Sequence, residues 1–188
     1  PGDIVLPSQY FDWTRGRRQS SFFGSGLSGH ISTAEPVCPT LTRWMADHAE
    51  KMNLTLHCGK TYACVEGPRL GTKAESHFLR LAGCDLVGMT NVPEAFLARE
   101  AQICYASICI ITDYDCWMDD PSHHASLASV LALYSRTIES VQDLLRSLMA
   151  SEPPPAECGC RASLKDAVIT PDDQVPASLK EMLAILRK

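Results

Sequence analysis

The sequence contains no block of basic residues, and its densest basic stretch is the short segment TRGRRQ near the start. The chain has 17 Lys and Arg against 22 Asp and Glu, which gives a formal net charge of −5 at pH 7. Nucleic acids and anionic membranes are bound mainly through clustered cationic side chains. The composition therefore argues against both classes of partner.

Long apolar runs are also missing. No stretch approaches the roughly 20 apolar residues that cross a bilayer, and we expect no secretory signal peptide. These observations predict a soluble, cytoplasmic protein. With 188 residues and 45% hydrophobic content, the chain is large enough for one globular domain with a substantial core.

The hydrophobic pattern predicts strands that alternate with helices, which indicates an α/β layered fold. Pro7 is expected to mark a sheet edge or the end of the first strand, Thr40 is a candidate cap of the first helix, and Gly83 is expected to end a later helix. We assign residues 1–150 to one domain and residues 151–188 to a tail. Strands are expected at 4–6, 54–58, 61–66, 84–90 and 103–115, and helices at 39–52, 72–83, 91–102, 123–150 and 177–188.

Two carboxylates follow the longest predicted strand, in the stretch IITDYDCW. In an extended segment, side chains at i and i+2 point to the same side. Asp113 and Asp115 are therefore expected to face one space beyond the strand's end, where open α/β sheets bind ligands.

Two other predicted strands end in polar or special residues. Glu66 begins a glycine-rich turn, and Thr90, after Met89, precedes a helix N-terminus, whose free N–H groups suit an anion such as phosphate. If the three strands are parallel, these ends converge on one pocket.

Each of these signals also has a purely structural interpretation. Asp113 or Asp115 could fix a turn or cap a helix, Thr90 could cap the next helix, and Glu66 could bind loop amides. Met89 is most often core packing. The two aspartates could also hold magnesium, although no nucleotide-binding glycine loop accompanies them. A further alternative is a metal-binding α/β domain in which the two aspartates and the histidines are the ligands.

Nine cysteines are many for this length. Those at 64, 84, 104 and 109 lie in apolar surroundings and are expected to be small buried hydrophobes. Cys158 and Cys160 form a CxC pair in a polar tail after three prolines. One such pair without a second ligand pair is a weak zinc signal, so we expect a structural tail whose cysteines can oxidise, and no metal site.

A resemblance to a known family rests on several motifs together. EGPR at 66–69, GMTNVPE at 88–94 and TDYDCW at 112–117 resemble the signature region of the 5′-methylthioadenosine phosphorylases, within the trimeric purine nucleoside phosphorylase family. PGDIVLPSQYFDWT and GHISTAEPVC match upstream segments in the right order. The likeness extends from Pro1 to about Met149. It implies a three-layer αβα fold with a mixed central sheet.

The resemblance also implies an activity: phosphate attacks the ribose C1′ of 5′-methylthioadenosine and releases adenine and 5-methylthioribose 1-phosphate. No cofactor is implied, because phosphate is a co-substrate. A homotrimer or hexamer is implied, since family sites lie at subunit interfaces. Other interpretations are a phosphorylase of broader 6-aminopurine or methylthioinosine preference, and a non-catalytic purine-binding subunit.

The roles of individual residues follow from the resemblance. Asp113 would act as general acid or N7 partner of the purine, which requires a neutral carboxyl favoured by burial beside Asp115. Asp115 would accept from the 6-amino group. The remaining purine-binding positions are Glu66, Leu70 and Gly71; the ribose and phosphate contacts are Met89 and Thr90; and the 5′-substituent would meet Leu127, Val130 and His30, the last from a neighbouring subunit.

Two departures from the family pattern bear on function. Gly71 stands where members often have Ser or Thr assisting the base contact. Members also begin with a strand, a GGSGL phosphate loop and an Arg-His pair that this sequence does not contain; GSGL at 24–27 is a different, mid-chain loop. We expect a separate N-terminal polypeptide to supply this portion, the alternative being a truncated, inactive product.

Overall fold

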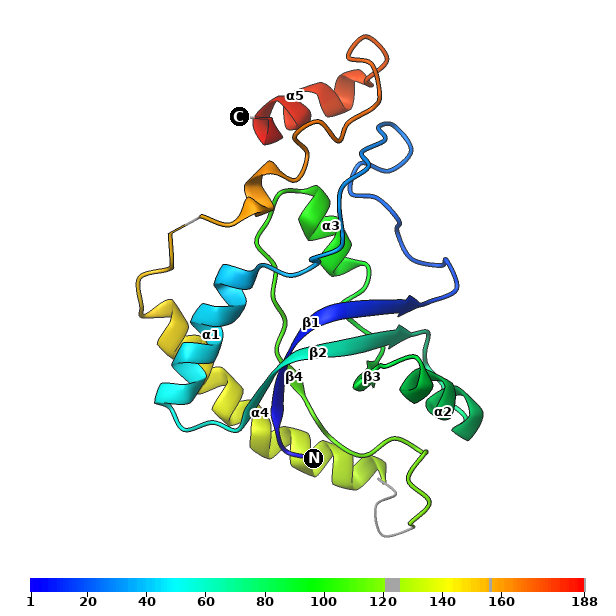
Figure 1. Ribbon diagram of the computed structural model, residues 1–188, viewed down its shortest axis with the longest axis vertical. Helices are drawn as coiled ribbons and strands as arrows, with labels where there is room; N and C mark the ends of the chain where they lie inside the picture. Colours follow the sequence, from blue (N-terminus) through cyan, green and yellow to red (C-terminus); the bar gives the residue numbers. More distant parts are fainter. Residues whose placement is uncertain (121–125, 156, 188) are drawn as a thin grey trace.

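The structure is a computed structural model that describes residues 1–120, 126–155 and 157–187. Its sheet has four strands in the order β3-β2-β1-β4, in which β1 pairs in parallel with β2, β2 in parallel with β3, and β1 antiparallel with β4. The central sheet is therefore mixed, as expected (Figure 1). The strands are β1 (Ile4–Trp13), β2 (Leu56–Val65), β3 (Leu86–Gly88) and β4 (Cys109–Ile110).

The first strand is longer than the sequence predicted. Pro7 does not end β1, which continues to Trp13, and β2 runs unbroken through Gly59. The register between the two strands shifts on both sides of Pro7, and Gly59 has a φ of +71°. An irregularity of this kind accommodates a residue without an N–H, so the strand continues past proline.

The predicted strand at 103–115 is wrong in its extent. Only Cys109 and Ile110 pair, with Val5 and Ile4 of β1, although backbone hydrogen bonds join Ile111 to Gly2 and Asp3. Most of this segment is half-buried rather than buried. An apolar run becomes a strand only where a neighbouring strand offers it hydrogen bonds, and among the described residues β1 pairs with this segment only at Ile4 and Val5.

The helices lie close to their predicted positions. Thr72 caps its helix through a reciprocal capping box with Glu75, and Gly83 follows the helix end with a φ of +81°. Thr40 is not the cap of the first helix, because the Cys38 side chain accepts from Leu41 N. The helices are α1 (Pro39–Lys51), α2 (Lys73–Leu81), α3 (Glu94–Glu100), α4 (Leu127–Met149) and α5 (Ala177–Leu186).

For the helix predicted at 123–150, the described residues form α4 from Leu127 onward, and Ser126 is its N-cap. Residues 123–125, including His123 and His124, lie outside the described residues. No helix in the described part of the chain is both long and apolar enough to span a membrane.

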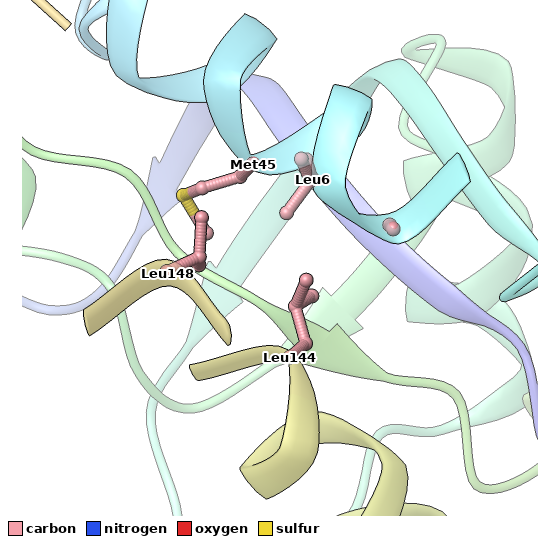
Figure 2. Packing of buried hydrophobic residues seen from close by; sticks show 5 residues of the cluster. Leu6, Met45, Leu144 and Leu148 are labelled. Atoms are coloured by element: carbon pink, nitrogen blue, oxygen red, sulfur yellow. The ribbon is translucent and has the colours of Figure 1, made fainter. Parts of the chain in front are cut away.

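Helices cover the sheet through two hydrophobic clusters. Leu6 of β1 meets Met45 of α1 and Leu144 and Leu148 of α4 (Figure 2). A second cluster contains Tyr62 and Cys64 of β2 together with Val92, and Phe96 of α3 packs against it. Burying a side chain such as Leu6 stabilises the fold by about 1.5–3 kcal/mol.

The tail returns to the body of the chain. The tail has a short 3₁₀ turn (Gly159–Ala162) followed by α5, and its Leu164, Val175 and Leu183 pack against Phe23 and Leu27 of the long loop that follows β1. His30 N donates to Ala167 O at 2.8 Å in the same contact. The tail and this loop, shown in orange-red and blue in Figure 1, therefore stabilise each other.

Candidate functional site

An open cavity of about 1140 Å³ lies over the carboxyl ends of β2 and β3 and extends along α4. Parallel strands bring both of these ends to one edge of the sheet, which places Glu66 beside Met89 and Thr90. All the predicted site residues except His30 line it: Glu66, Leu70, Gly71, Met89, Thr90, Asp113, Asp115, Leu127 and Val130.

The third polar strand end reaches the cavity by a route that the sequence did not predict. Because β4 is antiparallel to β1, its carboxyl end points to the opposite edge of the sheet. The following segment crosses back to α2: Cys116 Sγ lies 3.6 Å from Gly71 O, and the Arg80 guanidinium lies 3.8 Å from the Trp117 ring centroid. The expectation of three parallel ends is therefore wrong, although the residues do converge.

The two aspartates differ in their surroundings. Asp113 is exposed and its Oδ1 accepts from Thr112 Oγ1 at 2.7 Å. Asp115 is half-buried and its Oδ1 accepts from Cys116 N at 2.8 Å. The burial of Asp113 that the general-acid hypothesis assumed is therefore not provided by this chain alone.

Tyr62, which the sequence analysis did not single out, positions Thr90. The Thr90 N–H donates to the Tyr62 hydroxyl at 3.3 Å, and the two hydroxyl oxygens are 3.2 Å apart. Burial raises the pKa of Tyr62, so the phenol stays protonated. If it donates to Thr90 Oγ1, the Thr90 hydroxyl proton is left for a bound anion.

Two glycines allow the close approaches in this site. A Cβ at Gly88 would overlap the Tyr62 hydroxyl, and a Cβ at Gly67 would lie 2.6 Å from Met89 Sδ. These distances, 1.9 Å at Gly88 and 2.6 Å at Gly67, are shorter than the contacts that a Cβ makes with neighbouring atoms. Gly88 therefore permits the Tyr62–Thr90 contact, and Gly67 permits Met89 to lie over the turn after β2.

Arg18 connects the turns after β2 and β3, and sequence reasoning missed it. Its guanidinium donates to the carbonyls of Val92 and, at 2.9 Å, Met89, and it lies 3.5 Å from Glu66 Oε1. The local signal is the TRGRRQ stretch, which by its composition predicts only a short basic segment. A long cationic side chain with many donors is suited to holding several carbonyls at once.

Glu66 keeps an unused acceptor. Its Oε1 faces Arg18, whereas its Oε2 is buried and has no hydrogen-bond partner among the described residues. An unsatisfied buried carboxylate oxygen is costly. In a cavity wall, such an atom is available to a donor on a bound molecule.

The loop that carries Leu70 and Gly71 is held by an ion pair. Arg69 donates to Glu75 through both terminal guanidinium nitrogens, Nη1 and Nη2, at 2.8 and 2.6 Å. Hydrogen bonding from Arg69 lowers the pKa of Glu75 to about 2, and the Thr72 backbone contributes. Glu75 therefore stays ionised over the physiological range, which keeps the loop attached to α2.

His30 lies away from the cavity of its own chain. It is exposed, in the loop that packs on the tail. Because its predicted role was in a neighbouring subunit's site, this position leaves that role a prediction.

Known proteins resemble this chain over nearly its whole length. A curated S-methyl-5′-thioadenosine phosphorylase from Geobacter sulfurreducens is 40% identical over 187 residues, covering 99% of this chain and 65% of the relative. Another, from Thermosynechococcus vestitus, is 44% identical over 192 residues, and the match also covers 99% of this chain and 65% of the relative. The chain thus spans slightly less than two thirds of the length of these relatives.

Solved structures that resemble this chain are also phosphorylases. A methylthioadenosine phosphorylase from an antarctic soil metagenomic library superposes with a TM-score of 0.83 at 36% identity, covering 99% of this chain and 66% of that one. A mutant adenosine/methylthioadenosine phosphorylase from Schistosoma mansoni, in complex with methylthioadenosine, gives 0.71 at 30% identity, covering 81% and 60%. The sequence profile of the phosphorylase superfamily matches residues 1–150. From its sheet, its motifs and this match, the chain belongs to the phosphorylase superfamily.

Proposed function

We propose that this chain forms the nucleoside-binding part of an enzyme that cleaves 5′-methylthioadenosine with inorganic phosphate, giving adenine and 5-methylthioribose 1-phosphate. The observation that supports this most is the gathering of Asp113, Asp115, Glu66 and Thr90 around one cavity with Met89. The relatives' names point to the same substrate. Phosphate is the co-substrate, and the proposed reaction needs no cofactor.

The carboxylates act on the purine in this proposal. Cleavage of the N-glycosidic bond leaves a positive, oxocarbenium-like sugar and places negative charge on the departing base. Asp113 protonates N7 or donates a hydrogen bond to it, which makes adenine a better leaving group. Asp115 accepts from the 6-amino group, and Glu66 offers its unpaired Oε2 to another donor of the nucleoside.

Met89 and Thr90 act on the sugar and the phosphate. Met89 lies against Gly67 at the cavity wall and provides an apolar surface for the ribose. Thr90 donates its hydroxyl proton to phosphate, since its own N–H and oxygen are engaged by Tyr62.

The 5′-substituent is placed against α4. Leu127 and Val130, in the first turn of that helix, form an apolar wall of the cavity. A hydroxyl facing this wall would lose its water partners without replacement, whereas a methylthio group would not. Leu127 is 76% exposed in the single chain. We infer that a neighbouring subunit, contributing His30, closes this side in a trimer or hexamer.

Replacing Tyr62 by Phe is expected to raise KM for phosphate by about 2–10-fold, the value of one neutral hydrogen bond, with little change in kcat. The phenyl ring keeps the packing but no longer orients the Thr90 hydroxyl. Steady-state kinetics with varied phosphate measure this. Tyr10→Phe is the matched control, because it removes a half-buried hydroxyl that is hydrogen-bonded to Ser107 outside the cavity. An unchanged KM in Tyr62→Phe would refute the positioning role.

Gly71 favours a second candidate, a phosphorylase of broader 6-aminopurine or methylthioinosine preference. Among the described residues, a Cβ added here meets Glu75 Oε2 alone, at 3.9 Å, which leaves room for the missing hydroxyl. Gly71→Ser is expected to raise the preference for methylthioadenosine over methylthioinosine about 2–10-fold. Gly71→Ala adds the carbon without the hydroxyl and should leave the preference unchanged; equal behaviour of the two variants would contradict this account.

The test of the main proposal is a phosphorolysis assay on the native assembly that contains this chain, with methylthioadenosine, adenosine, methylthioinosine and inosine compared. Methylthioadenosine should rank first, and turnover should require phosphate. Calorimetric binding of adenine without turnover of any nucleoside would instead indicate a purine-binding subunit. Preference for a 6-oxopurine nucleoside would overturn the proposed substrate.

A further inference from the structure

Four cysteines that are distant in the sequence meet away from the cavity. The sulfur atoms of Cys38, Cys104, Cys158 and Cys160 all lie within 4.8 Å of one another. Cys38 and Cys160 are buried, and the other two are half-buried. In the sequence, the apolar surroundings of Cys104 predict a small hydrophobe, and the CxC pair has no second ligand pair near it. The fold supplies the second pair of ligands that the sequence pattern lacked.

Three separate segments bring these thiols together. Cys38 caps the N-terminus of α1, Cys104 follows α3, and the CxC pair opens the 3₁₀ turn of the tail. Cys104 Sγ and Cys158 Sγ are 3.3 Å apart although 54 residues separate them in the sequence. The Cys38 N–H donates to Tyr105 O at 2.8 Å, which fixes the first segment to the second.

We propose that the four cysteines bind one structural zinc ion. Zinc with four thiolates is tetrahedral, and Zn–S bonds of about 2.3 Å place the sulfurs roughly 3.8 Å apart. The cluster is already close to this size. Four protein ligands fill the coordination sphere and leave no open position, so the site is structural rather than catalytic.

The surroundings of the cluster suit bound thiolates. Four thiolates and one Zn²⁺ carry a net charge of −2, which needs donors and positive charge nearby. Arg99 Nη1 donates to Cys160 Sγ at 3.3 Å, and Leu41 N donates to Cys38 Sγ at 3.4 Å. The latter sulfur also lies at the positive end of the α1 dipole. Such outer contacts orient metal ligands and stabilise their charge.

Metal binding would attach the tail to the body of the enzyme. Arg99 reinforces this link, since its carbonyl accepts from Ser163 Oγ at 2.5 Å. The tail in turn packs on the loop that carries His30. Zinc would therefore fix the loop whose histidine we assign to the neighbouring subunit's site, and its loss would loosen both.

The first measurement uses the unmodified chain. Purified under reducing conditions from zinc-supplemented medium, it should contain about one zinc per chain by elemental analysis. Four thiols exchange four protons for the ion, so zinc added to reduced, metal-free chain at a pH where the thiols are protonated should release up to about four protons per metal. Co²⁺ in place of zinc should give the visible absorption bands of a tetrahedral thiolate site.

Variants locate the site. Cys158→Ser with Cys160→Ser, and separately Cys104→Ser, should lose the cobalt bands and lower the melting temperature. Cys58→Ser, which changes an exposed cysteine outside the cluster, should keep both metal content and stability. The measurements on the unmodified chain decide the matter if a variant fails to fold.

Three results would overturn the proposal. The first is a reduced chain with four reactive cluster thiols that takes up neither zinc nor cobalt. The second is a mass lower by two or four hydrogens, with peptide mapping that places disulfides among these four cysteines in the chain isolated from cells. The third is the persistence of the cobalt bands after all four cysteines are replaced by Ser.

Discussion

Replacing Asp113 by Asn is expected to lower kcat/KM for methylthioadenosine phosphorolysis by about 10²–10⁴-fold, the usual contribution of a general acid. Asparagine keeps the size of the side chain, so its packing is preserved, but it cannot transfer a proton to N7. It can still donate a hydrogen bond, which suits an oxygen at the purine 6-position. The loss should therefore be smaller for methylthioinosine and inosine, and the substrate ranking should move toward them.

Matched variants separate this effect from a general loss of charge. Asp143→Asn removes a carboxylate that pairs with Arg146 on the surface of α4, outside the cavity, and should leave the kinetics unchanged. Asp115→Asn should weaken adenine-nucleoside binding mainly through KM, since its role is recognition. The four nucleosides are compared with each variant at saturating phosphate. If Asp113→Asn lowers activity for all of them equally, the assigned role is incorrect.

Replacing Arg18 by Met is expected to lower both stability and activity. The guanidinium holds the carbonyls of Met89 and Val92 and faces Glu66. Its side chain is 21% exposed and that of Glu66 is 24% exposed, so water replaces these contacts poorly. Hydrogen bonds to a charged group contribute about 1.5–3 kcal/mol; we expect a loss of about 2–3 kcal/mol in the free energy of unfolding. The two carbonyls that Arg18 holds flank Thr90 in the chain, so their release should also move Thr90. A displacement of about 1 Å would lower kcat/KM roughly 10²-fold.

A double-mutant cycle tests the Arg18 argument further. Arg18→Met leaves the Glu66 carboxylate without its cation, so adding Glu66→Gln should recover part of the lost stability. Urea unfolding of the two single variants and the double variant measures this coupling. Arg43→Met, on the exposed side of α1, controls for the loss of a surface arginine. Strictly additive effects of the two changes would show that Arg18 and Glu66 do not interact.

The elements that the sequence predicted well depend on local interactions. The helix over 72–83 was recognisable because its apolar spacing, the Thr72 cap and Gly83 all lie within one short window. The motifs at 66–69 and 88–94 placed Glu66, Met89 and Thr90 at one sheet edge, because β2 and β3 are parallel and adjacent. Period, capping and turn chemistry are properties of neighbouring residues, so they can be recognised without coordinates.

The predictions that were wrong concern contacts between segments that are distant in the sequence. Pro7 was expected to end a strand, but pairing with β2 carries the chain past it. The apolar run at 103–115 was expected to be a long strand, but strand formation needs a partner, and the sequence does not state which one is adjacent. The antiparallel direction of β4 and the return of Trp117 to Arg80 likewise depend on pairing and packing.

The sequence by itself determined the α/β character, most helices and, through short motifs, nine of the residues that line the cavity. Only the tertiary structure placed Tyr62 and Arg18 behind Thr90 and Glu66, and only it brought Cys38 and Cys104 to the CxC pair. The physical reason is the range of the interactions: capping and periodicity act over a few residues, whereas a half-buried ion pair or a cluster of four thiols forms only when the fold closes long loops.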